Sequence, residues 1–169
     1  VLIVGDVLHS RVARSAMWGF AKMGANVTLS GPGTLLPLDL LRPNGHLPEG
    51  HFLASVIVDT NLDRAIVGAH VVMALRLQSA RQVIGYLPSM REYIRRWQVT
   101  ESRLASAKPN ALVMHPGPMN EGIEISSSLA HGGSSVIEEQ VTNGVAARMA
   151  LLYQVSIFPG VNGSPKALE

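Results

Sequence analysis

Three short segments of this chain carry groups that could bind a small charged ligand. Arg11 stands near the N-terminus, Arg76 and Gln78 follow an apolar run, and a His-Pro-Gly-Pro motif occupies His115–Pro118. Two guanidinium groups that face one crevice would hold a dianion, because each can form a bidentate pair with a carboxylate. In an extended segment Gln78 points the same way as Arg76 and offers both a donor and an acceptor.

The His-Pro-Gly-Pro motif predicts a stiff loop that binds through its backbone. Pro116 and Pro118 fix φ and lack N–H donors, and Gly117 lets a ligand approach the main chain closely. The carbonyl groups of this loop can therefore accept hydrogen bonds from a polar ligand. His115 itself is either part of such a site or a packing residue with satisfied hydrogen bonds.

Other interpretations of these residues stay open at this point. Arg11 and Arg76 could be ordinary surface ion-pair residues. His9 and Ser10 could bind the ligand or order the start of a helix, and we expect Ser10 to be its N-cap.

The sequence lacks the motifs that several kinds of chemistry require. The chain has no cysteine, no Gly-x-Gly-x-x-Gly loop, no Walker-type loop, no paired carboxylates and no histidine cluster for a metal. The chain therefore offers positioning groups but no obvious nucleophile. A reactant would have to bring its own nucleophile, and catalysis would come from orientation and electrostatics.

Short apolar runs alternate with helical patterns along the chain. The runs predict strands at 1–4, 26–29, 55–58, 71–75 and 111–114, and the patterns predict helices at 11–23, 61–68, 89–97, 101–107 and 135–156. This alternation is typical of an α/β, doubly wound, Rossmann-like fold with helices on both faces. We expect a five-stranded, mostly parallel sheet in the order 3-2-1-4-5. The three candidate loops then meet beside the switch point at the carboxyl edge.

The same patterns predict finer features. We expect the helix at 61–68 to be capped by Asp59 or Thr60, residues 78–88 to form a mobile loop and 121–134 to be irregular. The expected buried face of the first helix is Val12, Ala16, Phe20 and Met23, and that of the last is Val136, Gln140, Val141, Val145, Met149 and Leu152.

The bulk properties predict one domain over residues 1–157 and a tail over 158–169. Apolar residues make up 47% of the 169 residues, and no apolar stretch is long enough for a membrane span. The first residues lack the basic region of a secretory signal. A net charge of +2 is too small to favour nucleic acid. We expect a cytoplasmic protein with no membrane or nucleic-acid partner.

In five blocks the chain resembles the aspartate-binding domain of bacterial-type aspartate carbamoyltransferases. The blocks are Val4–Ser15, Gly31–Pro37, Val72–Gln78, His115–Asn120 and Gln140–Ala150. That family transfers a carbamoyl group from carbamoyl phosphate to L-aspartate in pyrimidine synthesis. The resemblance implies that Arg11, Arg76 and Gln78 bind the aspartate carboxylates. It also implies that Pro116 and Gly117, with Pro118 alongside, face the carbamoyl amide, and that no metal or cofactor takes part.

The resemblance also implies partners, and the chain departs from the family pattern at two positions. It leads us to expect a separate N-terminal carbamoyl-phosphate domain, a homotrimer of the full catalytic chain, and a regulatory subunit or a dihydroorotase as a further partner. Glu121 stands where the family usually has Arg, and Ala80 where it commonly has an acid. Ornithine carbamoyltransferases carry a cysteine in the His-Pro loop, and its absence here favours aspartate.

Two other functions remain as alternatives. One is a catalytically inactive carbamoyltransferase-like binding domain, which the Glu121 departure and the expected absence of the carbamoyl-phosphate domain from this chain suggest. The other is the dinucleotide-binding half of a dehydrogenase, which only the fold suggests.

Overall fold

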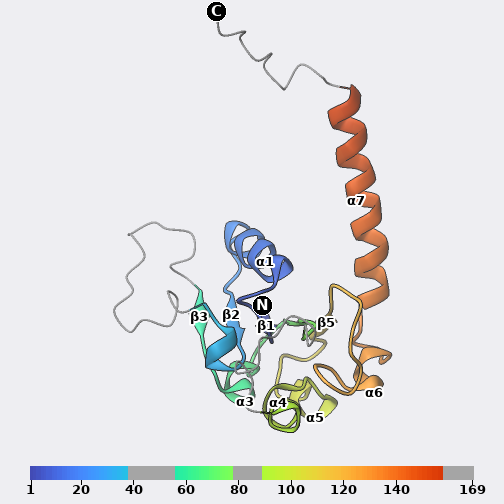
Figure 1. Cartoon of the computed structure of the whole chain (residues 1–169). Helices are drawn as coiled ribbons and strands as arrows, with labels where there is room; N and C mark the ends of the chain where they lie inside the picture. Colours follow the sequence, from blue (N-terminus) through green and yellow to red (C-terminus); the bar gives the residue numbers. More distant parts are fainter. Residues whose placement is uncertain (38–55, 78–88, 158–169) are drawn as a thin grey trace, which may run out of the picture.

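The fold is a five-stranded, all-parallel sheet in the order β3-β2-β1-β4-β5, seen in a computed structural model that describes residues 1–37, 56–77 and 89–157 (Figure 1). The strands are β1 (Leu2–Val4), β2 (Thr28–Ser30), β3 (Ile57–Val58), β4 (Val71–Ala74) and β5 (Leu112–Met114). The predicted fold class and strand order are confirmed. The predicted mobile loop and the tail lie outside the described residues.

Helices cover both faces of the sheet, as predicted. They are α1 (Arg11–Lys22), the 3-10 turn η1 (Gly33–Leu35), α3 (Leu62–Ala65), α4 (Met90–Trp97), α5 (Glu101–Leu104), α6 (Ser127–Ala130) and α7 (Ile137–Ile157). Figure 1 shows α1 on one face and α3, α4 and α5 on the other. The α6 helix lies inside the segment that the sequence predicted to be irregular. Its N-cap is Ser126, whose hydroxyl accepts a hydrogen bond from the Leu129 amide.

Alternate side chains of the central strands form two separate cores. The core under α1 contains Ile3, Leu29, Met73 and the helix residues Ala13 and Met17. The core on the other face contains Leu2, Val4, Val72, Val113, Leu62, Tyr93 and Trp97. This alternation is the two-residue period of a strand buried on both faces.

The predicted buried face of α1 was partly wrong. Ala16 and Phe20 pack against the core, but Val12 is exposed and Met23 is 84% exposed. The helix turns Ala13 and Met17 inward instead. Apolar residues cover more than half of its circumference, so the helical period alone could not choose between the two faces.

The helix termini follow local polar chemistry. The Ser10 hydroxyl accepts a hydrogen bond from the Ala13 amide at 3.1 Å, which confirms the predicted N-cap of α1. The predicted cap of α3 was wrong, because Asn61 fills that position. Asp59 pairs with Arg64 instead, and the guanidinium group lowers the pKa of that carboxyl.

The structure contradicts the predicted buried face of α7. Val141 and Val145 are about half exposed, and Met149 and Leu152 are each 66% exposed. Val136 and Gln140 are only half-buried, and Figure 1 shows α7 extending away from the sheet. The apolar pattern is present, but no described residue covers most of it. None of the described helices is long and apolar enough to cross a membrane.

The loops after β1 and β2 meet in a backbone contact that leaves no room for a side chain. The Gly5 amide donates to the Ser30 carbonyl at 2.8 Å, and Gly5 has a φ of +122°. A Cβ atom on Gly31 would lie 2.5 Å from the Gly5 carbonyl oxygen. Glycine at position 31 is therefore required for the loop that precedes α1 to keep its path.

We expect Gly31→Ala to lower the free energy of unfolding by about 2–3 kcal/mol, because the backbone must move to accept the methyl group. Gly33→Ala is the matched control in the same loop, since its Cβ would meet nothing within 4 Å. It should change stability by less than about 0.5 kcal/mol. Chemical denaturation of both variants checks this, and equal losses would contradict the close contact.

Candidate functional site

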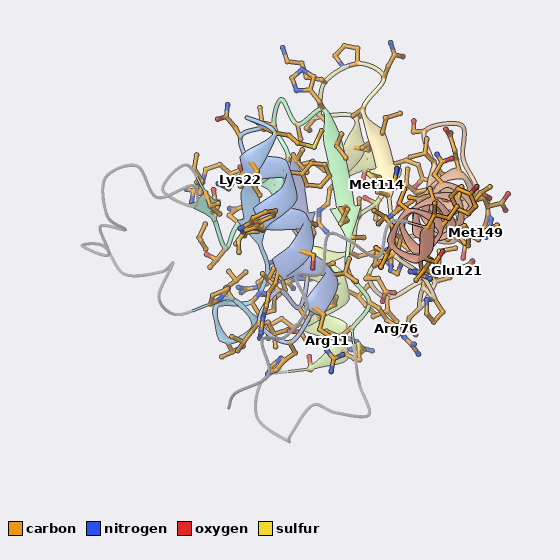
Figure 2. All side chains as sticks on the ribbon, turned by 90° about the horizontal axis from the view of Figure 1, so that it is seen from above. Arg11, Lys22, Arg76, Met114, Glu121 and Met149 are labelled. Atoms are coloured by element: carbon orange, nitrogen blue, oxygen red, sulfur yellow. The ribbon has the colours of Figure 1, made fainter. Side chains whose placement is uncertain are left out.

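The three candidate loops leave the sheet from strands that are neighbours. Val4 pairs with Ala74, and the Leu75 amide donates to the Val4 carbonyl at 2.8 Å, so the loops after β1 and β4 start side by side. The loop after β5 follows beside that of β4. Figure 2 shows Arg11 and Arg76 at the same end of the molecule, with Lys22 at the other end of α1. This is the edge at which doubly wound sheets bind ligands.

The loop after β1 is held by a buried carboxylate. Asp6 is buried, accepts a hydrogen bond from the His9 amide at 3.1 Å and lies 2.9 Å from His9 Nδ1. Arg14 donates to the Leu8 carbonyl at 2.9 Å. Together with the Ser10 cap these contacts fix the first turn of α1. His9 and Ser10 thus order the helix start, and Arg11 is left exposed at its first position.

The loop after β4 presents one arginine between two buried leucines. Leu75 and Leu77 are each 1% exposed, whereas Arg76 is exposed. Its backbone is anchored because the Leu77 carbonyl accepts a hydrogen bond from Asn120 Nδ2 at 3.1 Å. Arg76 therefore projects outward from a fixed segment. Gln78 lies outside the described residues.

The His-Pro-Gly-Pro loop is bound at both ends to side chains. The His115 amide donates to Gln140 Oε1 at 3.0 Å, and the Gly117 amide donates to His115 Nδ1 at 2.9 Å. Gly117 has a φ of +62°, and a Cβ there would meet open space. Pro118 is exposed. That the carbonyl groups of this loop bind a ligand stays a prediction from the sequence.

His115 does not face the crevice. Its side chain is fully buried, and Nε2 lies 3.3 Å from Glu124 Oε1. Glu124 is 1% exposed and also accepts the Asn120 amide at 2.5 Å. The interpretation of His115 as a satisfied packing residue is therefore the correct one. Sequence reasoning missed Glu124, whose only signal was a charged residue between Ile123 and Ile125.

Tyr93 from α4 belongs to the same buried polar region. Burial raises the pKa of its hydroxyl, and the negative charges of Glu124 and Asp6 raise it further. A Cβ on Gly5 would lie 3.0 Å from this hydroxyl, which places Tyr93 directly under the first loop. The phenol is thus neutral, and buried ionisable groups contact the loops after β1 and β5.

Glu121, the residue that departs from the family pattern, has its hydrogen-bond partners on and beside α6. Its Oε1 lies 3.2 Å from His131 Nε2, at the end of α6. A hydrogen bond from Ser127, and then His131, lower the pKa of its carboxyl. The carboxylate is therefore already engaged by α6.

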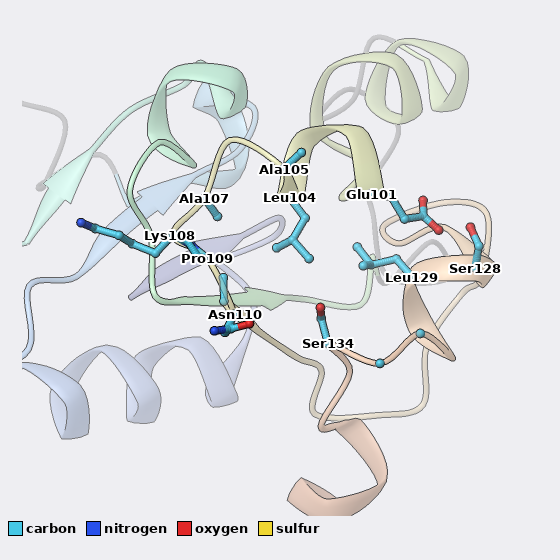
Figure 3. A pocket seen from close by; sticks show the side chains of 13 residues that line it. Glu101, Leu104, Ala105, Ala107, Lys108, Pro109, Asn110, Ser128, Leu129 and Ser134 are labelled. Carbon is cyan, nitrogen blue, oxygen red and sulfur yellow. The ribbon is translucent and has the colours of Figure 1, made fainter.

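A separate cavity opens at the amino end of β5, opposite the strand ends that carry the three loops. It has a volume of about 400 Å³ and lies beside the segment that leads into β5, including Lys108 and Asn110 (Figure 3). Glu101 and Ser128 stand on its far side. Because it adjoins the amino end of β5, it is distinct from the three loops. Among residues 1–37, 56–77 and 89–157 no cluster of His, Asp or Glu could hold a metal ion.

Comparison with known proteins gives a consistent result. Residues 1–155 match the family model described as aspartate/ornithine carbamoyltransferase, Asp/Orn binding domain. The chain is 54% identical over 159 residues to the aspartate carbamoyltransferase catalytic subunit of Roseiflexus sp. (strain RS-1), covering 92% of this chain and 47% of that protein. It is 53% identical to the corresponding subunit of Dehalococcoides mccartyi (strain CBDB1), covering 92% and 45%.

A solved structure shows the same fold. Ornithine carbamoyltransferase from Pyrococcus furiosus superposes with a TM-score of 0.74 at 25% identity, covering 89% of this chain and 47% of that one. The chain therefore spans about half the length of the relatives that it matches.

Proposed function

Since the chain belongs to the aspartate/ornithine carbamoyltransferase family through the Asp/Orn-binding domain, we propose that it is the aspartate-binding half of an aspartate carbamoyltransferase. The relatives from Roseiflexus sp. (strain RS-1) and Dehalococcoides mccartyi (strain CBDB1), at 54% and 53% identity, are each named aspartate carbamoyltransferase catalytic subunit. The ornithine carbamoyltransferase from Pyrococcus furiosus is 25% identical. The chain also has no cysteine in its His-Pro loop.

The proposed reaction transfers a carbamoyl group within pyrimidine biosynthesis. The amino group of L-aspartate attacks the carbamoyl carbon of carbamoyl phosphate, and a C–N bond forms. The C–O bond to phosphate breaks, phosphate leaves with the electron pair, and the proton that the amine loses is taken up by the departing phosphate. The chain contributes by holding the two reactants in place, which converts an encounter into a step within one complex.

Arg11, Arg76 and Gln78 are proposed to bind the two aspartate carboxylates. The observation that carries this is that both arginines are exposed at one edge, on segments fixed by buried neighbours. Neither has an ion-pair partner among the described residues. This favours ligand binding over a role in surface ion pairs. The carbonyl groups of Pro116 and Gly117, with Pro118 alongside, would receive the carbamoyl amide.

A second domain is proposed to cover α7. The chain spans about half the length of its relatives, and the apolar side of α7 has no cover among the described residues. A large exposed apolar surface marks an interface. We propose that this domain supplies the carbamoyl-phosphate site. A cytoplasmic homotrimer and a regulatory subunit or dihydroorotase partner stay predictions.

The catalytically inactive alternative rested on Glu121 and on the expected absence of the carbamoyl-phosphate domain from this chain. That residue is engaged by Ser127 and His131, so it gives no reason to expect a disrupted anion site. Nothing else in the described part of the chain favours inactivity. Carbamoyl aspartate formation by the complete protein separates the two functions directly.

We expect Arg76→Ala in the complete protein to lower kcat/KM for aspartate by roughly 30- to 800-fold. This corresponds to about 2–4 kcal/mol for a lost charge-assisted, bidentate pair. Binding of carbamoyl phosphate should be nearly unchanged. Steady-state kinetics with each substrate varied in turn checks this.

Lys22→Ala is the control, because it removes the same charge at the opposite end of α1 (Figure 2). Its kinetics should match those of the unmodified protein. If Arg76→Ala also left the aspartate dependence unchanged, Arg76 would be a structural residue only.

We expect Glu121→Gln to change the KM for aspartate by less than about twofold. Its carboxylate is already occupied at α6, and exposed ion pairs contribute little. The same kinetic assay measures this. A large gain in aspartate affinity would show that Glu121 acts on the anion site after all.

We expect the double variant Met149→Gln, Leu152→Gln to destabilise the complete protein by about 3–5 kcal/mol, since each side chain would lose an apolar environment. In this chain alone the loss should be below about 0.5 kcal/mol, because both are already exposed. Ala147→Gln, on the opposite side of α7 by the helical period, is the control. Equal effects in the two proteins would contradict the covering domain.

A further inference from the structure

A buried carboxylate beside the His-Pro-Gly-Pro loop calls for a physical reason. Glu124 is 1% exposed and its neighbour His115 is fully buried. A charged group in such a place is costly unless hydrogen bonds compensate it. Glu124 Oε1 has two such donors, whereas Oε2 has no partner among the described residues. The role of Glu124 must therefore follow from the two hydrogen bonds that its Oε1 accepts.

The hydrogen bonds around His115 assign its tautomer. Nδ1 accepts the Gly117 amide at 2.9 Å, so it carries no proton. Nε2 must then carry the proton of the neutral ring, and it donates toward Glu124 Oε1 at 3.3 Å. Both ring nitrogens are used, one on the loop and one on the carboxylate. The imidazole thus links Gly117 to Glu124.

A second link runs from Glu124 to the loop after β4. The Asn120 amide donates to the same Oε1 at 2.5 Å, and Asn120 Nδ2 donates to the Leu77 carbonyl at 3.1 Å. Leu77 directly follows Arg76. One continuous chain of hydrogen bonds therefore joins Gly117 to the residue beside the exposed arginine.

We propose that Glu124 and Asn120 are positioning residues that set the distance between the carbonyls of the His-Pro-Gly-Pro loop and the guanidinium group of Arg76. This inference rests on the proposed function, in which one loop receives the carbamoyl group and the other the aspartate. Glu124 is buried, and the side chain of Asn120 is bonded to the Leu77 carbonyl. They act through His115 and Leu77 on the relative position of two sites.

The expected consequence is on the chemical step rather than on binding. Each substrate keeps its own contacts when the His-Pro-Gly-Pro loop shifts relative to the loops that carry Arg11 and Arg76. The amine and the carbamoyl carbon, however, lose their alignment, and a misplacement of about 1 Å can cost about 100-fold in rate. A positioning role thus predicts a fall in kcat with little change in either KM.

The test is Asn120→Ala in the complete protein, which removes the bond to Leu77 and keeps the backbone bond to Glu124. We expect kcat to fall at least tenfold, with the KM of each substrate changed less than threefold. Asn61→Ala is the matched control, because Asn61 also bonds backbone through its side chain but only caps α3. It should lower thermal stability and leave kcat unchanged.

Glu124 is tested by a conservative and a disruptive variant. Glu124→Gln keeps an acceptor oxygen and should retain kcat within about fivefold, whereas Glu124→Leu should lower kcat at least as much as Asn120→Ala. ¹⁵N NMR of the His115 ring in this chain gives a readout without activity. The unmodified chain should show a protonated Nε2 and an unprotonated Nδ1.

The outcomes are distinguishable. An active protein whose Asn120→Ala variant keeps its kcat overturns the positioning role and leaves the proposed function standing. A His115 ring protonated at Nδ1 overturns the assigned link to Glu124. A complete protein that forms no carbamoyl aspartate overturns the proposed function, and the positioning role fails with it.

Discussion

The structure around the candidate site depends on the hydrogen bonds that one carboxylate oxygen of Glu124 receives. Through His115 it holds the loop after β5, and through Asn120 it reaches the loop after β4. Because the group is buried, losing either donor would remove one of the two hydrogen bonds that its Oε1 receives among the described residues. Two loops that could otherwise move independently are therefore fixed relative to one another.

The sheet supplies the other constraint on the site. The pairing of β1 with β4 brings Gly5 beside Leu75, and the loops that carry Arg11 and Arg76 diverge from there. Close backbone contact between Gly5 and Gly31 then directs the first loop toward the start of α1. The order of the parallel strands thus determines which residues can share a ligand. Buried polar side chains then fix the positions of the loops that carry them.

The apolar side of α7 is exposed among the described residues. Its apolar side chains have the spacing of a buried helix, yet the described residues leave them uncovered. A covering domain would explain that pattern and the half-length match to the relatives.

The sequence by itself determined the features that depend on local spacing and chain order. The strand order, the Ser10 cap and the meeting of three loops at one edge follow from apolar periodicity, capping chemistry and right-handed crossovers. Only the tertiary structure decided the inward face of α1, the uncovered state of α7 and the role of Glu124. These features depend on contacts between residues that are distant in the chain, or on the exposure of α7 among the described residues. Local sequence patterns predict neither.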